Sequence, residues 1–187
     1  MKKVIITFLF LLIIGNLFGQ SNKFGIWEVR DELDEFGDST GRKYITTINP
    51  ISGTYSNSRN NNSPLNITIK IISRGNSNQV IITPYLGARD VPGIPFGSRR
   101  EYSVAIRDKN NNIFRTREYL SLDNISFNFY NVLQQNFTIM HNAFMLGGII
   151  RIRMETDPDE RNKESYSFDI NNADGYRDAY NYLLSQQ

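Results

Sequence analysis

The feature that most constrains the fold is a strict alternation of apolar and polar residues between Leu65 and Ile72. Leu65, Ile67, Ile69 and Ile71 are apolar, and the residues between them are polar. Successive side chains of a β-strand point to opposite faces, so a period of two places these apolar residues on one face. The segment therefore predicts a strand with one face buried in a core and the other exposed.

Shorter alternations recur along the chain, separated by turn sequences rich in Asn, Gly, Asp and Ser. We expect further strands at residues 24–33, 42–49, 54–56, 80–86, 101–108, 113–118, 125–130, 149–154 and 166–170. Ile, Tyr, Phe and Thr are common in these segments, which is typical of strands. The pattern predicts a mainly β fold, a β-sandwich or open barrel of roughly eight to ten strands with two short helices.

Two segments depart from the period of two. Apolar residues recur at helical spacing at Leu133, Phe137, Met140 and Phe144. The pair Gly147-Gly148 predicts the end of that helix, because glycine accepts the left-handed conformation that often follows one. A C-terminal helix is predicted after Asp174, whose carboxylate we expect to cap its first turn. Its apolar stripe contains Tyr176, Ala179, Tyr180, Leu183 and Leu184.

Residues 1–19 have the layout of a secretory signal peptide. Lys2 and Lys3 precede an apolar run from Val4 to Ile14, and Gly19 is small enough to precede a cleavage site. The run is shorter than the roughly 20 residues of a membrane-spanning helix, so we expect cleavage and no transmembrane span afterwards. The chain is therefore expected to be secreted or periplasmic, with residues 20–187 forming a single β-sandwich-like domain.

The net charge and the cysteine content limit which partners, metals and cofactors are expected. Loss of Lys2 and Lys3 lowers the number of Lys and Arg residues from 21 to 19, which equals the 19 Asp and Glu residues. A neutral domain has no net charge to attract nucleic acid, so no nucleic-acid partner is expected. The chain has no cysteine and one histidine. The common zinc sites therefore cannot be built, and neither a metal nor a cofactor is expected.

The connection at residues 87–100 is the favoured candidate for ligand binding. Pro92 and Pro95 stiffen it, which limits the entropy lost when a loop is ordered by binding. It also carries side chains of types that often anchor ligands: Arg89, Phe96, Arg99 and Arg100. The alternative interpretation is a structural crossover between sheets, in which Phe96 fills the core.

Two other sets of titratable residues have structural interpretations. The acidic run from Asp31 to Asp38 does not match the spacing of a calcium-binding loop, and we interpret it as a solvated hairpin tip. His141 lies beside the apolar stripe of the predicted helix and is interpreted as a half-buried residue on its flank. No catalytic constellation is recognised in the sequence.

Several motifs are spread over most of the chain after residue 19. They are Trp27-Glu28-Val29 leading to residues 34–41, residues 53–58, Gly147-Gly148 before a strand, and Tyr166-Ser167-Phe168 leading to residues 174–176. Together they resemble motifs of small, uncharacterised secreted β-rich proteins of Bacteroidota. The resemblance implies a β-rich fold and an envelope location, and it brings no activity, cofactor or catalytic residue.

Two functional hypotheses follow. The first is a secreted or periplasmic non-enzymatic binding or interaction module, with an unknown protein or glycan partner in the envelope, because loops carry its anchor residues. The alternative is a hydrolase acting on an envelope glycan or peptide through carboxylates such as Asp31, Asp34 and Asp38. A pocket holding two of these carboxylates would favour the enzyme, and an exposed hairpin would favour the binding module.

Overall fold

A computed structural model describes residues 22–74, 77–85, 99–121, 126–130, 135–157 and 163–187. Within these ranges the helices are α2 (Gln135–Leu146) and α3 (Tyr176–Ser185). The strands are β1 (Lys23–Phe24), β2 (Trp27–Leu33), β3 (Ser39–Thr47), β4 (Ile51–Asn57), β5 (Ser63–Arg74), β6 (Ser77–Tyr85), β7 (Arg99–Arg107), β8 (Ile113–Ser121), β9 (Ser126–Tyr130), β10 (Ile150–Thr156) and β11 (Glu164–Ile170).

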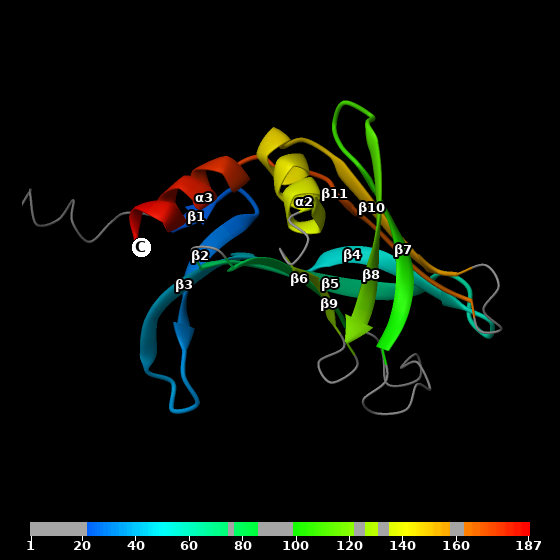
Figure 1. Cartoon of the computed structure of the whole chain (residues 1–187), viewed down its shortest axis with the longest axis horizontal. Helices are drawn as coiled ribbons and strands as arrows, with labels where there is room; N and C mark the ends of the chain where they lie inside the picture. Colours follow the sequence, from blue (N-terminus) through cyan, green and yellow to red (C-terminus); the bar gives the residue numbers. More distant parts are fainter. Residues whose placement is uncertain (1–21, 75–76, 86–98, 122–125, 131–134, 158–162) are drawn as a thin grey trace, which may run out of the picture.

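The described strands pair antiparallel in one sheet. Their order is β1-β2-β3-β5-β4-β11-β10-β7-β8-β9-β6. β6 also pairs with β5 from Asn66 to Arg74, so the sheet bends back on itself around the core. Figure 1 shows β4, β5 and β6 crossing under the steeply inclined β7, β8 and β10, with α2 and α3 above them. The predicted class, mainly β with two short helices of which one is C-terminal, is confirmed.

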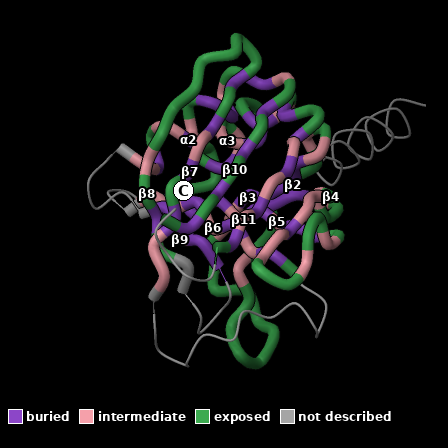
Figure 2. The backbone as a smooth tube through the Cα atoms, turned by 90° about the vertical axis from the view of Figure 1, so that its right-hand side faces the viewer, coloured by how far each residue is buried: buried purple, intermediate pink, exposed green. Residues whose placement is uncertain are grey.

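The alternation that predicted the first strand describes β5 correctly. Leu65, Ile67, Ile69 and Ile71 are at most 2% exposed. The same rule holds for β10, in which Ile150, Ile152 and Met154 are buried and the residues between them are exposed. Figure 2 shows buried and exposed positions alternating along the strands. Along β10, one face therefore lies in the core and the other in solvent.

The predicted strand at residues 24–33 is interrupted, which corrects the expectation of one continuous element. β1 and β2 form a tight hairpin around Gly25, whose φ is +63°. A Cβ at this position would lie 2.7 Å from the backbone oxygen of Asp174. Glycine is needed both for the left-handed conformation and for the close approach of the chain before α3.

Trp27 joins the sheet to both helices. Its side chain is 0% exposed, and its Nε1 donates a hydrogen bond to the Ala173 oxygen at 3.1 Å. The ring lies 5.4 Å from that of Phe144 in α2 and 5.3 Å from that of Tyr176 in α3. Tyr176, Ala179 and Leu183 are buried, as the apolar stripe predicts, whereas Leu184 of that stripe is 47% exposed. Neither α2 nor α3, the helices in the described ranges, has the length and hydropathy that a membrane crossing requires.

The predicted capping role of Asp174 is wrong. The N-cap of α3 is Gly175, with φ 89° and no side-chain capping hydrogen bond. Asp174 Oδ1 instead accepts a hydrogen bond from the Gly148 backbone N–H at 2.9 Å. Gly147 and Gly148 end α2 with φ of 73° and 69°, as predicted, and this turn presents the N–H to the carboxylate. The two helices are therefore tied together at their facing ends.

Candidate functional site

Four neighbouring strands, β11, β10, β7 and β8, carry the candidate site on their solvent-facing side. Their inward residues, such as Val104, Ile106 and Ile152, are buried in the core. Because side chains alternate along a strand, the intervening residues all face outward. β11, β10 and β7 pair with a described strand on both sides, whereas β8 pairs with β7 along its length and with β9 only at Leu120 and Ser121. A ligand on this face therefore meets mainly side chains, with a strand edge only at β8.

The pairing register aligns the outward residues in rows that cross the strands. The middle row consists of Arg115, Ala105, Arg153 and Ser167. On one side of it lie Arg117, Ser103, Glu155 and Ser165, and on the other Ile113, Arg107, Arg151 and Asp169. We call this surface the arginine face and define it by Arg107, Arg115, Arg117, Arg151 and Arg153.

Two adjoining hollows open on the arginine face. Their volumes are about 440 and 360 Å³, and both are lined by Ala105, Arg115, Arg153 and Glu155. Ala105 lies between Arg115 on β8 and Arg153 on β10, so a short side chain is flanked by two long ones. This contrast in size gives an otherwise flat sheet surface its depth.

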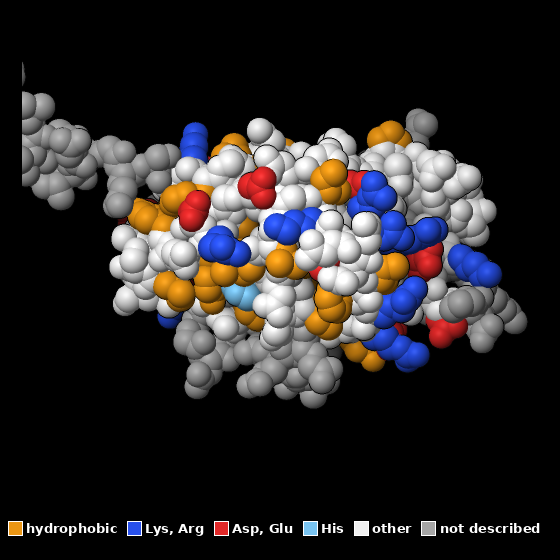
Figure 3. All heavy atoms as spheres, turned by 90° about the horizontal axis from the view of Figure 1, so that it is seen from above, with side chains coloured by type: hydrophobic (Ala, Val, Ile, Leu, Met, Phe, Trp, Pro, Cys, Tyr) orange, Lys and Arg blue, Asp and Glu red, His pale blue; other side chains and the backbone are white. Residues whose placement is uncertain are grey.

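The arginine face has more positive than negative charge. Three ion pairs cross it: Arg117 to Glu101 at 3.5 Å, Arg151 to Asp169 at 3.2 Å, and Arg153 to Glu155 at 2.7 Å. In the described part of the chain, Arg107 and Arg115 form no ion pair. Arg107 lies directly opposite Arg151, and like charges in that position destabilise a sheet. Figure 3 shows Arg and Lys side chains gathered toward the end of the molecule where these strands lie.

This arrangement suits an anionic ligand. Guanidinium groups present rigid forks of N–H donors that match carboxylate, sulfate and phosphate oxygens. The side chains of Arg151, Arg153 and Arg117 are 56%, 65% and 71% exposed, so a ligand can reach them. Among the described residues, no group of three or more His, Asp or Glu is placed to hold a metal ion.

Of the predicted binding residues, the structure describes Arg99 and Arg100. Arg89 and Phe96 lie outside the described residues, and Arg99 is the first residue of β7. Arg100 Nη1 lies 2.8 Å from Glu164 Oε1, and their side chains are only 17% and 6% exposed. Arg100 therefore takes part in a largely buried ion pair and does not line either hollow on the arginine face. Ligand binding by the connection at residues 87–100 stays a prediction.

A group of tyrosines surrounds this ion pair. The Tyr102 hydroxyl donates to Glu164 Oε2 at 2.5 Å, so both oxygens of that carboxylate are engaged. Burial raises the pKa of Tyr102 and of Tyr166 far above the usual range, and it raises the pKa of Tyr55 to about 12. All three hydroxyls stay neutral at physiological pH. The group is suited to holding the ends of β7 and β11 together.

The other predicted titratable residues have structural roles. Asp31 pairs with Lys43 at 2.6 Å, and Asp34 Oδ1 accepts hydrogen bonds from the N–H groups of Phe36 and Asp38. These carboxylates lie on the exposed hairpin between β2 and β3, as interpreted from sequence. His141 is half-buried, and its Nδ1 lies 2.9 Å from the Tyr176 hydroxyl.

The arginine face was not predicted from sequence, although its signal was present. Arginines stand two residues apart at 115 and 117 and again at 151 and 153, which marks them as outward residues of strands. Their convergence depends on β8, β7 and β10 being neighbours in that order. Strand order is set by contacts between distant parts of the chain, which a local pattern does not contain.

Comparisons with known proteins identify no relative. No protein-family model, no curated protein and no solved structure matches the chain. The charge, exposure and strand register of the arginine face are therefore the observations that bear on its function.

Proposed function

We propose that this protein is a secreted or periplasmic, non-enzymatic binding module that holds an anionic envelope ligand on the arginine face. The observation that carries the proposal is the placement of Arg107 and Arg115, two exposed arginines without ion pairs in the described chain, beside a hollow floored by Ala105. An anion bound there would relieve the repulsion between Arg107 and Arg151.

Several arginines must act together for useful affinity. An exposed ion pair contributes only about 0.2–1 kcal/mol, because water and salt weaken it. The arginine face offers five guanidinium groups within a few strand spacings of one another. A ligand with several acidic groups therefore suits the face better than a single small anion, and its binding should weaken as ionic strength rises.

The test is the salt concentration at which the mature domain elutes from immobilised heparin, used as a polyanionic probe. Arg115→Gln should elute at lower salt than the wild type, and Arg107→Gln/Arg115→Gln at lower salt still. The matched control is Arg42→Gln, which removes an exposed arginine on β3 at the far end of the sheet. Equal elution of Arg115→Gln and Arg42→Gln would contradict a specific arginine face.

The proposed location rests on the N-terminal pattern and the resemblance to secreted proteins of Bacteroidota. Expressed in a bacterium of that group, the protein should be recovered from the envelope or medium with Gln20 or a neighbouring residue at its new N-terminus. Recovery of cytosolic protein that still begins with Met1 would contradict the proposal. N-terminal sequencing of each fraction distinguishes the two results.

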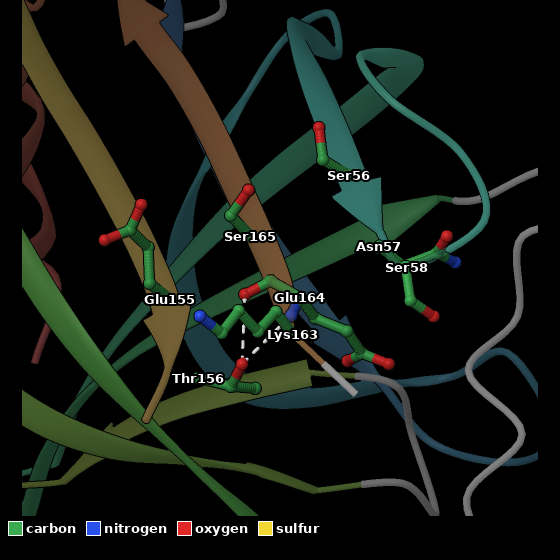
Figure 4. Close-up of a pocket in the computed structure, with 8 residues that line it drawn as sticks. All are labelled: Ser56, Asn57, Ser58, Glu155, Thr156, Lys163, Glu164 and Ser165. Atoms are coloured by element: carbon green, nitrogen blue, oxygen red, sulfur yellow. Dashed lines mark hydrogen bonds between the residues drawn. The ribbon is translucent and has the colours of Figure 1, made fainter. Parts of the chain in front are cut away.

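The hydrolase alternative has weaker support. Asp31, Asp34 and Asp38 lie on an exposed hairpin, and Asp34 is used by the turn itself. A pocket at the ends of β10 and β11 does contain two carboxylates, Glu155 and Glu164. Figure 4 shows them pointing away from each other, and both oxygens of Glu164 are already engaged. Paired acid and base catalysis needs carboxylates that converge on one bond.

A further inference from the structure

A third hollow continues the arginine face across the sheet. Its volume is about 320 Å³, and it lies where β4 and β10 end and β11 begins, beside the loop after Asn57. Glu155 lines this hollow and also both hollows of the arginine face. The three hollows therefore meet at one residue and form a path from β8 to β4.

The register supports a continuous path. Ser165 on β11 pairs with Glu155 on β10 and with Ser56 on β4. Figure 4 shows the side chains of Glu155, Ser165 and Ser56 pointing to the same side of the sheet. The row that begins at Arg117 on β8 thus extends to Ser56. Five neighbouring strands spaced about 4.8 Å apart give the row a length of about 19 Å.

The chemistry of the lining changes along this path. At the β8 and β7 end it is dominated by guanidinium groups, which bind acidic groups. In the third hollow, hydroxyl and amide groups of Ser56, Asn57, Ser58, Thr156 and Ser165 lie beside the charged side chains of Lys163, Glu155 and Glu164. The polar groups of Ser56, Asn57 and Thr156 also form hydrogen bonds within the protein. Hydroxyl and amide groups both donate and accept hydrogen bonds, as the hydroxyls of a sugar require.

We propose that the ligand is an acidic polysaccharide whose chain crosses the strands from the arginine face into the third hollow. This inference rests on the proposed function, and it adds the ligand class and the direction of binding. The acidic groups contact the arginines, and neutral sugar hydroxyls contact the polar third hollow. Glu155, where the three hollows meet, forms an ion pair with Arg153. Its negative charge repels the acidic groups of the ligand.

Two other polymers fit the path less well. Single-stranded nucleic acid is usually held by aromatic side chains on which its bases stack, and none of the described residues that line the three hollows is aromatic. An extended peptide commonly binds by adding a strand to a sheet edge, which on this face is the side of β8 that β9 leaves unpaired from Ile113 to Tyr119 in the described chain, so it would run along β8 and not across the strands. A sugar chain needs neither feature.

The test measures the affinity of heparin oligosaccharides of two, four, six and eight sugars by calorimetry at one low salt concentration. The wild-type affinity should rise with length until the chain spans the path. Ser165→Tyr, which fills the third hollow from an outward position, should weaken binding of the longest oligosaccharide about tenfold and leave the disaccharide unchanged. Ser165→Ala is the matched control, because it keeps the hollow open.

A second variant tests the role of Glu155, where the three hollows meet, without changing the size of the side chain. Glu155→Gln removes the opposing carboxylate and should strengthen binding of every length about fivefold, the equivalent of about 1 kcal/mol. A weaker affinity in Glu155→Gln would overturn the assignment of Glu155. Urea unfolding of each variant shows whether the domain is still folded.

The remaining outcomes separate this inference from the proposed function. Equal affinity for all four lengths, or for Ser165→Tyr and wild type, would overturn the path while leaving an anion-binding face. Binding of oligothymidylate as tight as that of heparin at the same salt would overturn the polysaccharide in favour of nucleic acid. Absence of binding to heparin oligosaccharides, oligothymidylate and polyphosphate would overturn both proposals.

Discussion

Replacing Trp27 by alanine should remove a large share of the stability of this domain. The side chain is fully buried, and a buried tryptophan removes about 150–250 Å² from water. At about 25 cal/mol per Å² this area corresponds to about 4–6 kcal/mol, an upper estimate. Measured costs of truncating a large buried aromatic residue to alanine are about 3–5 kcal/mol, compared with about 5–15 kcal/mol for a whole domain.

The contacts of Trp27 allow a graded series. Trp27→Phe keeps a ring between Phe144 and Tyr176 but loses the hydrogen bond to the Ala173 oxygen. That oxygen retains a longer hydrogen bond, 3.3 Å, from the Tyr176 N–H. Trp27→Phe should therefore cost about 1–2 kcal/mol, well below the cost of alanine.

Urea unfolding followed by far-ultraviolet circular dichroism is the appropriate assay. Trp27 is the only tryptophan, so its fluorescence is lost in both variants. A cost below about 1 kcal/mol for Trp27→Ala would refute the reasoning, because it would mean that the site has no close packing to lose. Trp27 would then have to be reconsidered as a ligand-stacking residue.

Three further predictions concern other parts of the fold. Gly53→Ala should destabilise the domain by about 1–3 kcal/mol in urea unfolding, because the new Cβ would lie 2.7 Å from the Ser167 oxygen. Burial lowers the pKa of His141, so the unfolded chain takes up the proton more readily. Stability should therefore be full above about pH 6.5 and decline as pH falls, and His141→Gln should reduce this decline in urea midpoints. Truncation after Ile170 removes Tyr176 and Leu183 and should lower the melting temperature, because α3 covers β2 and β3. An unchanged melting temperature would show that α3 is not part of the core.

Strand existence was predictable because the signal is local. The alternation from Leu65 to Ile71 follows from burial of one face of the strand. It is visible in this segment alone and does not depend on which strands pair with it. The helical stripe that includes Phe137 and Phe144 was recognised for the same reason. Boundaries were less accurate, since the turn at Gly25 depends on the approach of Asp174 from the other end of the chain.

Two side chains have partners that a local pattern does not contain. Asp174 has the residue type and position of a helix cap, but the Gly148 N–H, brought in by the turn after α2, takes its carboxylate. Arg100 has the residue type of a ligand anchor, but it lies beside the buried Glu164, 64 residues further along the chain. In both cases a partner distant in sequence decides the role of the side chain. Sequence composition alone identifies neither partner.

The alternation in β7, β8 and β10 gives substitutions and insertions different consequences during evolution. Outward positions such as Arg107, Arg115 and Arg153 can be substituted without removing a core contact, because the alternate residues fill the interior. The charge of this surface can therefore change while the fold is maintained. An insertion of one residue in β10 has the opposite consequence, because it would turn its arginines inward and its isoleucines outward. Variation at this surface should therefore consist of substitutions, with strand length preserved.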